Sequence, residues 1–414
     1  MKNRYRPLTA FLVLTVALMA CALPFGGSPG STPDQVATVV AMTMQALTPA
    51  SADVTTPTSE PEASPAGLLP QALYFLNNDG IGNLQVFRLD VDGESLTQIT
   101  SEPAAVGSYD VSPADGSVAY VLNNQLLLVN ADGSDRRMLV DGGPVDPADP
   151  FISSISSPVF SPDGQTIAFS KQGLVLYSLA SGASNVVLEE MTTDPVTGAP
   201  TPAKVFIPQS YSPDGTKILV TGAIPRSDGF IQQIYNIAAD STVPLSGEDG
   251  ARLCCDQQAW TADSSALYVG NSSFGLFLPG LWRIDATTGA VTTLIPGEAG
   301  GALYNTPDEP YLAPDGQLYF LYAQVTAPDG FSARAPLQLV RSGLDGVTGR
   351  TVLRPETFEL MNEALWAPDA SFIIAAMAPS ETVFAGGQVN LFYTDPAQPV
   401  IFLLPFGQQL KWGP

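Results

Sequence analysis

Acidic side chains are the groups in this sequence best placed to do chemistry, because the chain contains no histidine. The absence of histidine removes Ser-His-Asp and Cys-His catalytic arrangements and every histidine-based metal site. No G-x-S-x-G nucleophile motif occurs in residues 71–414, and no G-x-x-x-x-G-K-[ST] phosphate loop occurs in the sequence. Three kinds of chemistry remain open: glycoside chemistry by a pair of carboxylates, Ca²⁺-assisted lysis, and reactions of a bound redox cofactor. With 40 Asp and Glu residues, some carboxylate pairs must occur, so their presence does not decide among the three.

The acidic residues of interest fall in long segments that connect predicted strands. They could form a negative rim that binds Ca²⁺ or a basic partner, or simply a solvated rim that keeps the protein soluble. We expect no cofactor, although Ca²⁺ remains open. The candidate rim consists of Asp141, Asp146, Asp149, Glu189, Glu190, Glu248, Asp256, Asp308, Glu309, Glu359 and Glu363.

Cys254 and Cys255 are adjacent in the sequence and could form a vicinal disulfide in an oxidising compartment. Neighbouring Cα atoms lie about 3.8 Å apart, below the usual disulfide range of about 4.4 to 6.8 Å, so such a ring is strained. A rigid apolar platform for a ligand is one interpretation. The other interpretations are that the disulfide only stabilises the loop, or that the two cysteines are reduced and buried.

A repeated turn defines the elements that must position these residues. In Phe160–Gly164, Pro162 presets φ for a type I turn, and Gly164 accepts the positive φ that closes the hairpin. An alternating strand follows each copy, and the copies recur about every 50 residues, a period typical of propellers or solenoids. The related turns are Val111–Gly116, Tyr211–Gly215, Trp260–Ser264, Leu312–Gly316 and Trp366–Ala370.

The repeat resembles the β-propeller unit of TolB-like and WD40-like (PD40-type) proteins, in which an aromatic residue precedes Ser-Pro-Asp-Gly. The resemblance covers roughly Ala72 to Pro414 and implies an all-β fold. Seven strand pairs occur against six turns, and Leu410–Pro414 matches Ala364–Pro368 before the sequence stops. We therefore predict a seven-bladed propeller of four-stranded antiparallel blades in which the C-terminal strand completes blade one. Six blades are the alternative.

Successive strands of an antiparallel blade run in opposite directions, so their connections should alternate between two faces of the propeller. The Ser-Pro-Asp-Gly turns and the short Asp-Gly turns share one, which we call the tight-turn face. The connections after the second and fourth strands of each blade share the other, which we call the long-loop face. Function is more often placed on long loops that a rigid scaffold carries.

The N-terminal segment is predicted to be a targeting signal in residues 1–20, with basic residues followed by the apolar stretch Leu8–Ala20. Leu18–Cys21 resembles a lipobox, which would make Cys21 the lipidated first residue; ordinary signal cleavage is the alternative. Residues 21–70 are expected to be a Pro/Ser/Thr-rich spacer with a short helix at 34–47, and residues 71–414 the propeller domain.

The formal net charge of −23 argues against a nucleic-acid partner. The favoured interpretation is a non-enzymatic propeller, lipid-anchored to a bacterial envelope membrane outside the cytoplasm. It would bind a protein, peptide or glycan on its long-loop face. The alternative is a carbohydrate-active or cofactor-dependent enzyme that uses acidic groups near the central channel. Relatives with this repeat can carry a peptidase domain, whereas this chain is expected to end at the closing strand.

Overall fold

The computed structural model describes residues 67–147, 149–194, 196, 198–225, 229–247, 253, 257–274, 279–326 and 334–414. The chain divides into two compact units, residues 1–64 and 65–414, and all described residues belong to the second. The predicted signal segment, Cys21, the spacer helix, Glu248, Cys254, Cys255 and Asp256 lie outside the described residues.

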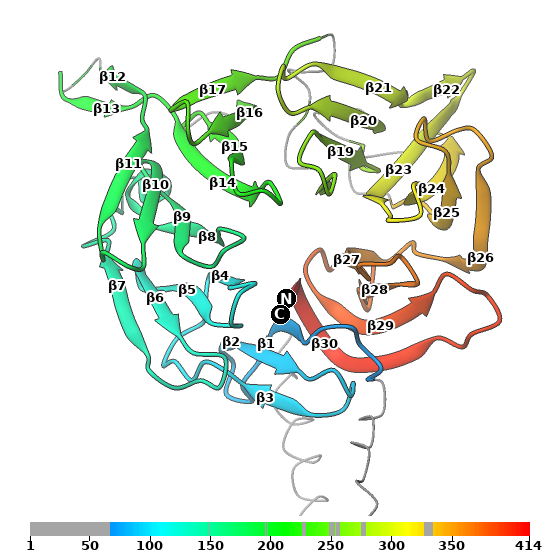
Figure 1. The fold of residues 1–414 in the computed structure, drawn as a ribbon, viewed down its shortest axis with the longest axis horizontal. Helices are drawn as coiled ribbons and strands as arrows, with labels where there is room; N and C mark the ends of the chain where they lie inside the picture. Colours follow the sequence, from blue (N-terminus) through cyan, green and yellow to red (C-terminus); the bar gives the residue numbers. More distant parts are fainter. Residues whose placement is uncertain are drawn as a thin grey trace, which may run out of the picture. The chain divides into compact units, whose positions relative to one another are not determined.

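The regular secondary structure of the described part is almost entirely antiparallel β-sheet, as the period-two alternation predicts. Four-stranded sheets follow one another along the chain and stand around a common centre (Figure 1). Three of them are β4 (Ser108–Val111) to β7 (Arg137–Asp141), β8 (Ser156–Phe160) to β11 (Ser184–Leu188), and β14 (Val205–Tyr211) to β17 (Ser241–Pro244). Their middle strands are β5 (Val118–Leu122), β6 (Gln125–Val129), β9 (Thr166–Lys171), β10 (Gly173–Ser178), β15 (Lys217–Ala223) and β16 (Phe230–Asn236).

The next two sheets continue the pattern. One consists of β18 (Gln257–Trp260), β19 (Ala266–Asn271), β20 (Gly280–Asp285) and β21 (Val291–Ile295). The other consists of β22 (Glu298–Gly300), β23 (Leu303–Leu312), β24 (Leu318–Thr326), β25 (Gln338–Ser342) and β26 (Thr351–Thr357). A separate hairpin of β12 (Met191–Thr193) and β13 (Pro200–Pro202) and the short helix α3 (Pro150–Ser153) lie in connections between sheets.

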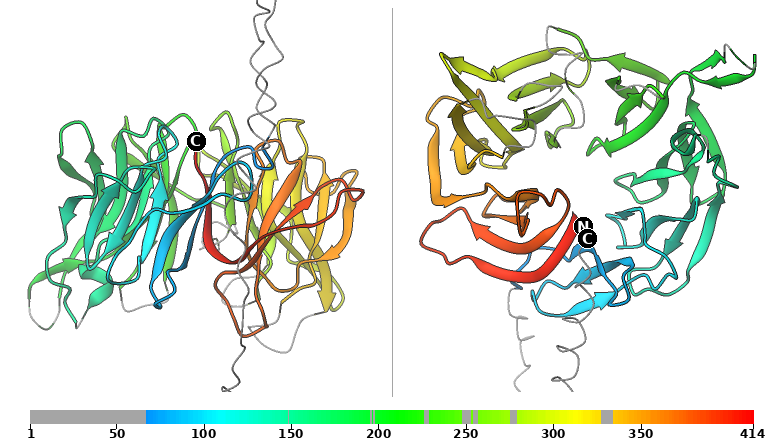
Figure 2. Two further views of the ribbon diagram at one scale, coloured as in Figure 1. Left: turned by 90° about the horizontal axis from the view of Figure 1, so that it is seen from below. Right: turned by 180° about the vertical axis from the view of Figure 1, so that it is seen from behind.

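The last sheet joins the two ends of this unit. Its strand order is β27-β28-β29-β30-β1-β2-β3. The strands are β27 (Met361–Trp366), β28 (Phe372–Met377), β29 (Gly387–Tyr393), β30 (Ile401–Trp412), β1 (Leu73–Asn78), β2 (Leu84–Leu89) and β3 (Leu96–Gln98). The first half of β30 pairs with β29, and its end pairs with β1, where Leu73 is opposite Trp412 and Tyr74 is opposite Lys411. Figures 1 and 2 show β30 running inward to a C terminus near the centre. The predicted pairing of the C-terminal strand with the strand near residue 72 is confirmed.

The repeated turns adopt the predicted geometry. Gly164 has φ +69°, and its N–H donates to the carbonyl of Ser161 at 2.8 Å. Two copies lack glycine at this position, yet Ser264 and Ala370 adopt φ values of +59° and +57° with the same hydrogen bond. These turns therefore tolerate a left-handed non-glycine residue, which is uncommon and costs conformational energy.

The core consists of apolar clusters between neighbouring sheets. Phe169 of β9 packs with Leu126 of β6, and Leu267 of β19 packs with Leu219 of β15. Phe75 of β1 belongs to one cluster with Ile374 of β28, so the two halves of the seven-stranded sheet, on either side of β30, also share a core. Burying a Leu, Ile or Phe side chain contributes about 1.5–3 kcal/mol, so these interfaces hold the sheets together.

Candidate functional site

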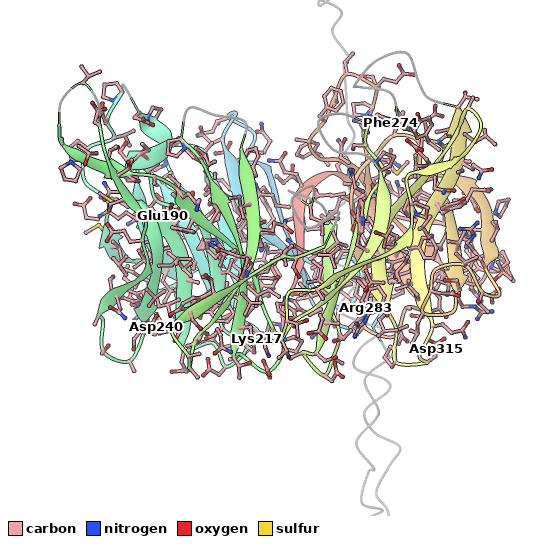
Figure 3. All side chains as sticks on the ribbon, turned by 90° about the horizontal axis from the view of Figure 1, so that it is seen from above. Glu190, Lys217, Asp240, Phe274, Arg283 and Asp315 are labelled. Carbon is pink, nitrogen blue, oxygen red and sulfur yellow. The ribbon has the colours of Figure 1, made fainter. Side chains whose placement is uncertain are left out.

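The connections of the described sheets separate onto two faces, as strand parity predicts. Figure 2 shows the strands side-on, running between these faces. Figure 3 shows Asp240 and Asp315, which lie in turns after a third and a first strand, and Lys217 and Arg283, which lie in strands near such turns, toward one edge, with Phe274 toward the other. The first edge is the tight-turn face, and the second is the long-loop face.

Among the described residues, the three most exposed large apolar side chains lie on long-loop connections. Ile81, Val196 and Phe384 are 84, 90 and 62% exposed. The others that are exposed on or beside long-loop connections are Val145, Phe151, Met191, Ile224, Ile231 and Leu303, whereas those on or beside tight turns or on outer strands are Val91, Leu96, Met138, Val186, Leu344, Val347, Val352, Val400 and Phe402. Highly exposed apolar side chains on one face are candidates for contact with a partner.

Two of these loops are held in place by polar side chains. The buried Asn124 accepts a hydrogen bond from the N–H of Ile155 at 2.6 Å and donates to the carbonyls of Gly143 and Ser153 at 2.9 and 3.2 Å, which fixes the loop that carries Val145 and Phe151. Such bonds reduce the conformational freedom that the loop would lose on binding.

The loop that carries Phe384 is fixed by an arginine. Arg334 donates hydrogen bonds to the carbonyl of Val383 at 2.6 Å and to Oδ1 of Asn362 at 2.8 Å. Its guanidinium also lies 5.0 Å from the ring centroid of Phe384, within the range of a cation–π contact. The aromatic side chain is therefore presented at a defined position.

Part of the predicted acidic rim does lie on exposed connections. Asp141 and Asp146 are exposed before and within the β7–β8 connection, and Asp149 is half-buried beside α3. Glu189, Glu190 and Glu359 are exposed between strands, and Glu190 forms an ion pair with Lys204 at 2.6 Å. These residues are spread over separate connections. Within the described ranges, no group of three Asp, Glu or Cys side chains could hold a metal ion.

The predicted placement in connecting loops is wrong for Asp308, Glu309 and Glu363, which lie in strands. Asp308 and Glu309 lie on β23 and Glu363 lies on β27, the strands nearest the centre in their sheets. Glu309 is 7% exposed, and the other two are half-buried. A bulge between Asp308 and Tyr311 bends the strand, and Glu309 has a left-handed backbone with φ +48°.

Hydrogen bonds hold this carboxylate cluster, which we define as Asp308, Glu309 and Glu363. Asp308 accepts from the hydroxyl of Ser272 and from the N–H of Glu309. Oε1 of Glu309 accepts from the N–H of Ala364 at 3.2 Å. Oε2 of Glu363 accepts from the N–H of Leu410 at 3.2 Å, while its buried Oε1 has no partner.

Burial changes the acidity of the cluster. It raises the pKa of Asp308 to about 6 and that of Glu363 to about 7, because the charged forms lose their hydration. Burial also raises the pKa of Glu309 well above its usual value, and the neighbouring charges of Asp308 and Glu363 add to this shift. The cluster can therefore hold protons at pH values where exposed carboxylates are ionised, and strongly shifted groups of this kind often mark functional sites.

Polar contacts continue from the cluster through the inner strands to β8. Lys411 of β30 forms a 2.6 Å ion pair with Asp110 of β4, and the hydroxyl of Tyr109 donates to the carbonyl of Gln409 at 2.6 Å. Asp110 also accepts from the N–H of Phe160 at 2.6 Å. Sequence analysis missed Tyr109, Asp110 and Lys411 in this role. The only sequence feature that could have identified them is that they are polar residues on the strands predicted to lie innermost in their blades.

Comparisons with known proteins concern the fold alone. No family model and no curated protein matches the sequence. A prolyl endopeptidase structure is similar, with a TM-score of 0.50 and 13% identity, over 83% of this chain and 51% of that chain. A structure of oligogalacturonate lyase in complex with manganese has a TM-score of 0.50 and 13% identity, over 81% and 86% of the two chains. TolB from Acinetobacter baumannii has a TM-score of 0.41 and 16% identity, over 79% and 77%.

The class of protein is therefore an all-β propeller of antiparallel four-stranded sheets. Across the described residues, no helix has both the length and the apolar character to cross a membrane.

Proposed function

We propose that this protein is an extracytoplasmic, lipid-anchored binding module that recognises a protein, peptide or glycan through its long-loop face. The observation that carries the proposal is that the most exposed large apolar side chains of the described residues, Ile81, Val196 and Phe384, lie on that face, two of whose loops are held in place by Asn124 and Arg334. Acidic side chains lie on the same connections, so a partner surface that combines apolar and basic groups fits best.

The scaffold in this proposal is a closed ring of seven blades. Its support is that β30 ends one sheet and begins the next, so that β27–β30 and β30–β3 can each be counted as a four-stranded blade. Apolar clusters also lie between each sheet and its successor, including the last and the first. A closed ring has no unpaired sheet edge at its junction and gives the loops a rigid support.

The anchor in this proposal is Cys21, on the basis of the lipobox-like Leu18–Cys21 segment. Each buried methylene of an attached acyl chain contributes about 0.8 kcal/mol, so two or more chains anchor stably. Metabolic labelling with radioactive palmitate tests this, with Cys21→Ser as the control. Equal labelling of the two proteins would remove the anchor from the proposal.

The binding role is tested by affinity capture from solubilised envelope with matched surface variants. We expect a captured partner to be lost with Phe384→Ser and Ile81→Ser, which remove apolar side chains from the long-loop face. It should be retained with Leu344→Ser and Val347→Ser, which make the same change on the tight-turn face. Equal capture by both pairs, or loss only with the second, would contradict the assignment.

A second candidate function is catalysis by the carboxylate cluster, because groups with a pKa near neutrality suit proton transfer. The strained backbone at Glu309 adds to this candidate, since strain gathers at functional sites. The direct test is turnover of oligogalacturonate with Ca²⁺ or Mn²⁺ added, followed by absorbance of the unsaturated product. Turnover that Glu309→Gln abolishes would favour the enzyme, and its absence would leave the binding module.

A further inference from the structure

A pocket of about 290 Å³ opens on the tight-turn face, between the β8–β11 sheet and the β14–β17 sheet. Two repeated turns supply its acidic side, with Asp163 from one and Asp214 from the other. Leu176 and Ile237 supply apolar walls, and Tyr211 lines the pocket from the end of β14. The pocket lies on the face opposite the long loops, so it is separate from the proposed binding face.

The hydroxyl of Tyr211 is the unusual feature of this pocket. Tyr211 is only 8% exposed, and its buried oxygen has no hydrogen-bond partner. The tryptophans that precede other repeated turns each form a hydrogen bond through the indole N–H. Nε1 of Trp260 donates to Oγ of Ser210, Nε1 of Trp366 donates to the carbonyl of Glu309, and Nε1 of Trp412 donates to the carbonyl of Trp366, at 2.7–2.9 Å. A buried polar group without a partner is costly, and Tyr211 lines the pocket, so a ligand atom that reaches its hydroxyl would relieve this cost.

The charges around the pocket favour a cation. A hydrogen bond from Ser161 lowers the pKa of Asp163. Although burial opposes ionisation of Asp214, hydrogen bonds from Ser212 and Thr216 lower its pKa to about 2. Both are therefore carboxylates at neutral pH. Lys217 lies 3.9 Å from Asp214 and offsets part of that charge, whereas the formal net charge of −23 repels anions from the whole surface.

The tyrosine itself stays protonated. Burial raises the pKa of Tyr211 well above its usual value, and the nearby charge of Asp163 adds to the shift. Its neutral oxygen can accept a hydrogen bond from an N–H group. An ammonium ion has several N–H donors and no acceptor, so it can satisfy this oxygen and a carboxylate together.

We propose that this pocket binds a small organic ammonium compound with an apolar body. The ammonium group donates hydrogen bonds to the hydroxyl oxygen of Tyr211 and to the Asp163 carboxylate, and the apolar body packs against Leu176 and Ile237. The arrangement of an apolar cavity with a few convergent polar groups is typical of small-molecule sites.

Titration with three isosteric probes tests the proposal: benzylammonium, benzyl alcohol and benzoate at pH 7, followed by ligand-observed NMR on the whole propeller unit. We expect benzylammonium to bind about tenfold more tightly than benzyl alcohol, and benzoate not to bind. Tyr211→Phe keeps the ring and removes only the oxygen, and it should weaken benzylammonium binding about tenfold. Asp163→Asn should have a similar effect.

The matched control is Asp315→Asn, which makes the same charge change in the corresponding turn between β23 and β24. It should leave benzylammonium binding unchanged. Equal affinity in Tyr211→Phe and the wild type would overturn the proposal, as would equal loss with Asp315→Asn. Failure of benzylammonium to bind in preference to the alcohol would mean that the hydroxyl contacts water only. Circular dichroism and the thermal midpoint of each variant show whether it folds.

Discussion

Replacement of Glu363 by glutamine isolates the energetic cost of the carboxylate cluster. Oε2 of Glu363 accepts the N–H of Leu410 at 3.2 Å, which links β27 to the closing strand β30. A glutamine oxygen can accept the same bond. The substitution therefore removes the titrating charge and keeps the contact.

The magnitude follows from the pKa. Burial raises the pKa of Glu363 from 4.5 to about 7 in the folded protein. Each unit of difference corresponds to about 1.36 kcal/mol, so ionisation in the folded state costs about 3 kcal/mol. Because the folded state binds the proton more tightly, this cost is absent below pH 4.5, grows as pH rises from 4.5 to 7, and is complete above pH 7.

Urea denaturation, monitored by tryptophan fluorescence between pH 5 and pH 8, measures this effect. We expect the wild type and Glu363→Gln to have similar free energies of unfolding near pH 5. Near pH 8 the variant should be more stable by about 3 kcal/mol. Glu359→Gln is the control, since Glu359 is exposed and the two substitutions change the net charge equally.

Two results would refute the reasoning. If the free energies of the wild type and Glu363→Gln change in parallel with pH, then Glu363 does not carry the cost. If Glu359→Gln is stabilised as much as Glu363→Gln, then the gain reflects only the reduced negative charge of the whole protein.

Four further outcomes are expected. Deletion of Leu410–Pro414 should lower the thermal midpoint markedly, because β1 loses its pairing with β30; an unchanged midpoint would contradict the closure. Lys411→Met should cost about 1–3 kcal/mol in urea, because Asp110 is left half-buried without its cation, and adding Asp110→Asn should recover part of the loss. Gln232→Met should add about 1–3 kcal/mol to the free energy of unfolding, because the side-chain nitrogen and oxygen of Gln232 are both buried without hydrogen-bond partners. A lower free energy of unfolding would contradict this, since it would mean that Gln232 does have a hydrogen-bond partner. Alkylation without reductant should leave Cys254 and Cys255 unlabelled if they form a vicinal disulfide, and mass spectrometry showing two labels would exclude it.

The parts of the fold that depend on local turn chemistry could be predicted from the sequence. Gly164 has the positive φ that its turn requires, and the copies ending in Ser264 and Ala370 keep that turn without glycine. The C-terminal pairing could be predicted because Leu410–Pro414 matches Ala364–Pro368 and because seven strand pairs occur against six turns. Both inferences rest on repetition. When several copies of a repeat are present, the turn can be recognised even in a copy whose own sequence departs from the pattern.

The carboxylate cluster could not be predicted because the sequence of β23, which carries Asp308 and Glu309, lacks the pattern typical of a strand. Pro307 and Pro310 flank Asp308 and Glu309, and prolines with acidic residues normally indicate a loop. β22 pairs with β23 only at Leu303 and Tyr304, so the edge of β23 that faces away from β24 is unpaired at Pro307 and Pro310 and tolerates proline. Gly270 of β19 also gives β23 room, since a Cβ there would come within 3.2 Å of the Cα of Asp308.

The position of these acids, rather than their number, is what distinguishes them from the exposed rim. Exposed residues such as Glu190 stay hydrated, and their charges cost the fold little. Glu309 and Glu363 instead lie where the inner strands of neighbouring sheets meet, and each accepts a backbone N–H from the next inner strand. Protonation there must alter the contacts between sheets, whereas protonation of the rim alters only the surface potential. The same two hydrogen bonds therefore make the central strands, and not the acidic loops, the part of this propeller whose stability responds to pH near neutrality.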